Sequence, residues 1–251
     1  MNQLKFILPD LDANKDKGAN FLIKGPSGFG KTRMAKAICD YLAGKHYQFF
    51  LGESSRFSFV KRVVFIDEIH TVANLERFYP VMDTKTHVFV FATNHDATLP
   101  EAFVNRCYEF VFDDYSDDEL LLMVREYIKF PATDTQLMEI INAGNRNPRI
   151  ILESLCDRLV IYFRENKISD TSAIDFRQLI LDIFRIDDGL DTLCKRYIEV
   201  LKSLGGRASF NLIKTLLHTD EDSIKNNVEP ILIRKKILEI TSKGRSLINN
   251  G

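Results

Sequence analysis

One short run near the N-terminus constrains the fold more than any other part of the chain. Residues 25–32 match the pattern G-x-x-x-x-G-K-[ST] throughout, as Gly25, Pro26, Ser27, Gly28, Phe29, Gly30, Lys31 and Thr32. The run follows an apolar stretch at residues 20–24 and opens a segment, residues 31–42, whose apolar side chains recur at helical spacing. A glycine-rich turn between a buried strand and a helix is the context that phosphate binding requires. A chance glycine-rich turn would lack these flanking elements.

The residues of this run predict ATP and Mg²⁺ as ligands. Glycines let successive backbone N–H groups curl around phosphate oxygens, and the start of the following helix adds partial positive charge. We expect Lys31 to reach the β- and γ-phosphates and the Thr32 hydroxyl to bind Mg²⁺.

A second apolar run, residues 63–66, ends in the acidic pair Asp67 and Glu68. Ligands bind at the carboxyl ends of strands in open α/β sheets, so both carboxylates are expected at the nucleotide. Asp67 is the predicted Mg²⁺ residue, and Glu68 the predicted general base for the attacking water. The alternative is a solvent-exposed acidic strand end, which the nearby phosphate loop argues against.

Further apolar runs at residues 87–92 and 108–112 alternate with helical stretches, which predicts a three-layer α/β fold around a parallel sheet. We expect residues 1–113 to form this nucleotide-binding core. Residues 114–185 read as a helical lid domain. Residues 186–251 read as a winged helix, three helices followed by a small hairpin.

The phosphate loop followed by the sequence IDEIH resembles the AAA+ ATPases. Three further segments are similar to that family. The strand ending at Asn94 resembles sensor 1, with Asn94 or Thr93 placed to polarise the water. Arg106 ends a segment resembling the arginine-finger region, and Arg149 follows Asn147 and a proline as in sensor 2. The resemblance implies an oligomer, because an arginine finger acts on a neighbouring subunit. A surface salt bridge for Arg106 and a capping or surface position for Arg149 remain open.

The C-terminal segments 186–191, 228–233 and 241–245 are similar to the winged-helix end of the RuvB family of Holliday-junction branch-migration motors. This resemblance implies a ring, by analogy of six subunits, that moves duplex or branched DNA. Residues 71–86 leave no room for the hairpin insertion that docks a partner protein in that family. The chain therefore resembles a reduced form of it.

Basic residues gather near the C-terminus, although the formal net charge of the whole chain is only -1. Any DNA contact must therefore come from a local patch. The predicted DNA-binding residues are Arg234, Lys235, Lys236, Lys243 and Arg245. The alternative is a solvated basic face.

Three functions compete at this stage. The first is a DNA-translocating or branch-migrating motor. The second is an ATP-dependent loader or switch that recruits a partner in replication or recombination, such as a helicase, a clamp or a transposase. The third is a protein remodeller that uses its winged helix to bind protein.

The remaining composition is that of an ordinary globular protein. The four cysteines have no metal-ligand or disulfide-scaffold spacing, so we expect reduced, packed thiols. We see no signal peptide and no apolar stretch of membrane-spanning length, which predicts a cytoplasmic protein without a membrane partner.

Overall fold

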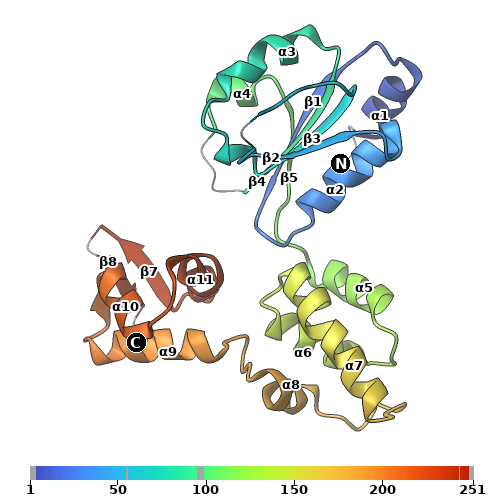
Figure 1. Ribbon diagram of the computed structural model, residues 1–251. Coiled ribbons are helices and arrows are strands. Elements are labelled where there is room, and N and C mark those ends of the chain that lie inside the picture. The colour runs from blue at the N-terminus through green and yellow to red at the C-terminus, as the bar shows by residue number, and fades with distance from the viewer. Residues whose placement is uncertain (1–3, 55, 95–98, 243, 249–251) are drawn as a thin grey trace. The chain divides into compact units, whose positions relative to one another are not determined.

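The computed structural model describes residues 4–54, 56–94, 99–242 and 244–248 (Figure 1). The chain divides into two compact units, Met1–Asp114 and Tyr115–Gly251. None of the helices in the described parts of the chain has the length and apolarity needed to cross a membrane.

A five-stranded parallel sheet with the order β2-β3-β4-β1-β5 forms the centre of the first unit. Its strands are β1 (Ala19–Gly25), β2 (Gln48–Leu51), β3 (Val63–Asp67), β4 (Val88–Asn94) and β5 (Tyr108–Val111). The predicted parallel α/β sheet is confirmed. Strand β2 was not predicted, because this edge strand alternates between half-buried and exposed residues and lacks a continuous apolar run.

Both faces of the sheet are covered, which explains the continuous apolar runs. Phe21 and Phe65 point into one core and the adjacent Leu22 and Val64 into the other, as the two-residue period of a strand requires. Helices α1 and α2 cover the first face, and α3 and α4 lie over the second (Figure 1). The helical elements of this unit are α1 (Leu4–Ala13), α2 (Lys31–Ala43), the 3₁₀ turns Ile69–Thr71 and Glu76–Phe78, α3 (Tyr79–Thr84) and α4 (Glu101–Val104).

The connection from β3 to β4, described throughout, consists of 3₁₀ turns and the short helix α3. It contains no hairpin, in agreement with the expectation for residues 71–86. The sheet strands are therefore joined here by a compact helical link that packs Phe78 and Met82 against the second face.

Helices alone build the first half of the second unit. They are α5 (Asp117–Tyr127), α6 (Asp134–Ala143), the π-helical segment Ile150–Cys156 running into α7 (Asp157–Glu165), and α8 (Phe176–Phe184). Ser116 and Thr133 begin α5 and α6 with reciprocal capping boxes, each side-chain oxygen accepting from the backbone N–H three residues on. Helix α8 was not predicted from the sequence, although Asp175 caps its start.

A winged helix forms the second half of this unit around a separate core. Its elements are α9 (Thr192–Ser203), β6 (Arg207–Ala208), α10 (Phe210–Leu217), α11 (Glu221–Ser223), the π-helical segment Ile224–Val228, α12 (Glu229–Arg234), β7 (Leu238–Thr241) and β8 (Gly244–Leu247). The three short strands form an antiparallel sheet in the order β6-β8-β7, of which β6 was not predicted. We propose that the separate cores mark two domains, divided near residue 186 as the sequence suggested.

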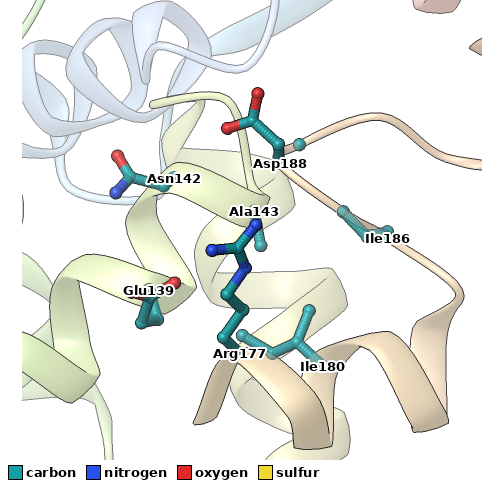
Figure 2. A pocket seen from close by; sticks show the side chains of 8 residues that line it. Glu139, Asn142, Ala143, Arg177, Ile180, Ile186 and Asp188 are labelled. Atoms are coloured by element: carbon teal, nitrogen blue, oxygen red, sulfur yellow. The ribbon is translucent and has the colours of Figure 1, made fainter.

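The segment joining the two cores lines a hollow of about 170 Å³ (Figure 2). Gly189 is needed here because a Cβ atom would lie 2.5 Å from Asn145 Oδ1. Asn145 Nδ2 donates to the Gly189 carbonyl at 2.6 Å, and Arg177 of α8 forms an ion pair with Asp187 at 3.5 Å. These contacts tie the joint to helices α6 and α8.

Candidate nucleotide site and winged helix

The phosphate loop lies between β1 and α2, as predicted, and two of its residues have a left-handed backbone. Gly28 and Gly30 have φ angles of 86° and 93°, which glycine adopts without the steric cost that a side chain brings. The Phe29 side chain between them is buried, so it anchors the loop in the protein interior. Left-handed glycines at these two positions give the loop backbone the kind of curl in which phosphate-binding loops cradle an anion.

Lys31 and Asn94 meet at the carboxyl edge of the sheet. Gly25 and Asn94 are paired in the register of β1 and β4, which places the end of the sensor strand beside the start of the loop. Lys31 Nζ donates to Asn94 Oδ1 at 3.2 Å and to the Pro26 carbonyl at 2.9 Å. The ammonium group is thus positioned at the mouth of the loop.

Thr32 and Asp67 also come together at this edge. Thr32 Oγ1 donates to Asp67 Oδ2 at 2.9 Å, and the Asp67 residue is 9% exposed. A hydroxyl and a carboxylate side by side offer oxygen ligands, which a hard divalent cation prefers.

Glu68 follows Asp67 in a left-handed backbone conformation with φ 53°. A non-glycine residue in this region costs on the order of 1–3 kcal/mol, and such strain is typical of functional positions. His70 Nδ1 lies 3.3 Å from Glu68 Oε2 and 3.0 Å from Thr93 Oγ1. We did not predict a role for His70 from the sequence, although it stands in the acidic segment directly after the strand.

Arg106 lies in the first unit with its guanidinium bound within its own chain. Its Nε and Nη2 donate to the two carboxylate oxygens of Asp83 at 2.9 and 3.2 Å, and Nη1 donates to the Ala102 carbonyl at 2.7 Å. The guanidinium also lies 4.5 Å from the ring centroid of Tyr79. The hydrogen bonds to Asp83 raise the pKa of Arg106 further, so this arginine is cationic at all accessible pH values.

Arg149 belongs to the second unit, where it immediately precedes the helical segment Ile150–Cys156. Asn147 Oδ1 accepts from the Arg149 N–H at 3.1 Å and so caps this helix, while the Arg149 residue is exposed. The capping role that the sequence left open for Arg149 is thus performed by Asn147.

Arg245 of the wing faces the interior of the winged helix. Its Nε and Nη2 donate to Glu229 at 2.8 and 3.2 Å, and the two side chains are only 17% and 4% exposed. The Tyr197 hydroxyl donates to the same carboxylate at 2.8 Å, and the guanidinium lies 4.5 Å from the Phe210 ring centroid. This geometry gives Arg245 a structural partner where we had expected it to contact DNA.

The other predicted DNA-binding residues occupy different surroundings. Arg234 Nη1 donates to the Asn145 carbonyl at 2.8 Å, and Lys235 pairs with Asp188 at 3.5 Å, so both contact the joint between the two cores. Lys236 is exposed just before β7. Lys243 lies outside the described residues.

The parallel sheet carries the phosphate loop after β1 and the acidic pair at the end of β3. The strand β4, which ends at Asn94, lies between β1 and β3. This fold and this arrangement are those of the AAA+ ATPase class.

Comparison with known proteins narrows the class. Residues 187–251 match the family described as the RuvB C-terminal winged helix domain. The Holliday junction branch migration complex subunit RuvB of Mycoplasma genitalium is 27% identical over 100% of this chain and 91% of its own length. The RuvB of Mycoplasma pneumoniae is 24% identical with the same coverage.

A solved structure agrees in fold. The RuvB Holliday junction branch migration motor of Thermotoga maritima has a TM-score of 0.80 and 20% sequence identity, covering 99% of this chain and 90% of that one. Within the AAA+ class, the chain is RuvB-like.

Proposed function

We propose that the chain is an ATP-driven motor that moves duplex or branched DNA, as the relatives named for Holliday-junction branch migration do. The observation that carries this proposal is that one chain contains both a nucleotide site and a winged helix. Thr32 contacts Asp67 and Lys31 contacts Asn94 at the carboxyl edge of the sheet, the nucleotide edge of this proposal, and a winged helix of the RuvB type follows in the chain.

The residues of the nucleotide edge take separate roles in this proposal. The curled loop backbone and Lys31 bind the phosphates of ATP, and Asn94 holds the attacking water in line. Glu68 orients that water and takes up its proton. Thr32 and Asp67 would hold Mg²⁺, which when bound neutralises charge on the β- and γ-phosphate oxygens.

Two arginines are assigned to the γ-phosphate from outside this edge. Arg106 stands at the end of the sheet opposite the phosphate loop, because it lies two residues before the start of β5, whereas the loop follows the parallel strand β1. In this proposal it serves a neighbouring subunit as the arginine finger, and the working protein is a closed ring. Arg149, exposed at a helix start, serves as the sensor of the lid.

DNA contact is assigned to the winged helix. Lys236 is exposed beside the hairpin, and Lys243 falls between its two strands in the sequence, so both suit contact with phosphate groups. Arg234 and Lys235 contribute at the joint, and Arg245 contributes by holding the hairpin in place.

The alternative function, an ATP-dependent loader or switch, is favoured by one observation. The link between β3 and β4 has no hairpin, although this is where the resemblance places the docking site for a partner. A loader would bind DNA with ATP and recruit a partner without moving the DNA itself.

Remodelling of a labelled four-way junction with homologous arms tests the proposal. With ATP and Mg²⁺, the protein should convert the junction into two duplexes, and Glu68→Gln should not. ATP-dependent binding without conversion, under conditions where the protein hydrolyses ATP, would overturn the motor and favour the loader.

A further inference from the structure

A short chain of polar contacts joins the sensor strand to the carboxylate of Glu68 through one imidazole. His70 Nδ1 lies 3.0 Å from Thr93 Oγ1 and 3.3 Å from Glu68 Oε2. Thr93 is fully buried, whereas the side chains of His70 and Glu68 are 28% and 42% exposed. The contacts therefore run from a fixed position in the sheet out to the edge where the nucleotide binds.

The backbone of Glu68 is held from two further sides. Thr71 Oγ1 donates to the Glu68 carbonyl at 2.9 Å. Gly52 lies so close that a Cβ atom there would be 2.2 Å from the same carbonyl oxygen, so only glycine fits. With φ at 53°, the residue is strained and fixed, and rotation of its side chain is the freedom that remains.

The His70 imidazole contacts the Glu68 carboxylate directly. A carboxylate only accepts hydrogen bonds, so an imidazole N–H is the group that would hold it. Nδ1 also hydrogen-bonds with the Thr93 hydroxyl, which fixes the plane of the ring. A ring held in this way orients the carboxylate and leaves its second oxygen available to the water.

We propose that His70 is a positioning residue that holds the Glu68 carboxylate in its working orientation, with Thr93 as the anchor of the imidazole. The inference rests on the proposed role of Glu68 as general base. Thr93 directly precedes Asn94, which accepts from Lys31, so one strand end supports both the phosphate-binding ammonium and the base.

Steady-state kinetics of His70→Ala and His70→Asn test this role. An asparagine amide can occupy the place of Nδ1 and donate to the carboxylate. We expect kcat of His70→Ala to fall roughly 10- to 100-fold with an unchanged KM for ATP, since a misplaced base slows chemistry without weakening binding. His70→Asn should recover part of the loss. The matched control is His46→Ala, which removes an exposed imidazole after α2 and should keep the parental kcat.

A double-mutant comparison separates this inference from the function on which it rests. If His70 acts through Glu68, adding His70→Ala to Glu68→Gln should lower the residual rate no further. Normal turnover by Glu68→Gln would contradict the proposed base itself. An inactive Glu68→Gln together with parental kcat for His70→Ala, or with a changed KM alone, would overturn only the role of His70.

Thr93→Val and Thr93→Ser provide a second route if His70→Ala does not fold. Valine keeps the packing volume but removes the hydroxyl that anchors the ring, whereas serine keeps the hydroxyl. The inference requires kcat to fall in Thr93→Val and to be retained largely in Thr93→Ser, with equal binding of a fluorescent ATP analogue by both. Equal kcat values for the two variants would contradict it.

Discussion

Arg106 and Asp83 form a two-pronged ion pair, with nitrogen–oxygen distances of 2.9 and 3.2 Å. Asp83 lies in the last turn of α3, and Arg106 follows α4, so two separate elements fix the guanidinium. The Asn20 amide adds a third contact by donating to the Arg106 carbonyl at 3.0 Å. The surface salt bridge that the sequence left open for Arg106 is thus present, and as a finger this arginine would exchange Asp83 for a phosphate of the neighbouring subunit's nucleotide.

Arg106→Ala should abolish most ATP turnover but leave ATP binding unchanged, because the proposal has this arginine serve the site of a neighbouring subunit. Losses of about 10³-fold are typical for such a residue. Mixing Arg106→Ala with Lys31→Ala subunits tests the arrangement, since mixed rings contain some sites with an intact lysine and an intact neighbouring arginine. Turnover should reappear in the mixture. Two inactive proteins that stay inactive when mixed would contradict action between subunits.

Lys31→Ala and Glu68→Gln should separate binding from chemistry. Lys31→Ala removes the charge that we propose meets the β- and γ-phosphates, so ATP affinity should be lost. Glu68→Gln keeps the shape of the site but cannot take up a proton, so ATP should bind and turnover fall about 10²- to 10⁴-fold. Equilibrium binding of labelled ATP and phosphate release check both variants. Tight ATP binding by Lys31→Ala would refute the assignment of the loop.

Arg245→Ala should destabilise the winged helix by about 3–5 kcal/mol, since it leaves the buried Glu229 carboxylate without its cationic partner. Denaturant unfolding followed by circular dichroism measures the change. The exposed Lys236 supplies the control, because Lys236→Ala should change stability by no more than about 0.5 kcal/mol. Equal stability of the two variants would mean that the pair with Glu229 contributes little.

Lys236→Ala should weaken DNA binding uniformly across sequences and reduce the salt dependence of binding. Each lost phosphate contact lowers the slope of log K against log salt by about 1. Fluorescence anisotropy with duplex DNA over a salt series gives that slope. An unchanged slope would remove Lys236 from the DNA-contacting surface.

All four cysteines should resist thiol reagents in the folded protein. Burial raises the pKa of Cys39, Cys107, Cys156 and Cys194 to about 12 from 9.0. Because the pKa rises, the reactive thiolate at pH 8 is about a thousandfold scarcer than in the unfolded chain. Reaction should be slow in buffer and rapid for all four in denaturant. Rapid labelling of one native thiol would show local opening there.

Elements with strong local signals were predictable from the sequence. The loop at residues 25–32 requires glycine at left-handed positions, and Ser116 with Glu119 forms a capping box that identifies the start of α5. Strand β2 and strand β6 were missed because each depends on pairing with a distant partner, β3 or β8, and not on its own apolar pattern.

Side-chain partners distant in the sequence were the main part that could not be predicted. The basic residues after Pro230 show their charge in the sequence, but nothing local indicates that Arg245 turns inward to Glu229. A role for His70 could likewise not be predicted, because it depends on strand β4 placing Thr93 beside the imidazole. In both cases, a contact between separate elements determines the role.

Steady-state ATP hydrolysis measured without DNA and with linear, forked and four-way-junction DNA tests the central claim most directly. Glu68→Gln serves as the blank. A RuvB-like motor should hydrolyse ATP faster as the DNA becomes more branched. A low rate that is indifferent to every DNA would contradict the proposal that ATP turnover drives DNA movement.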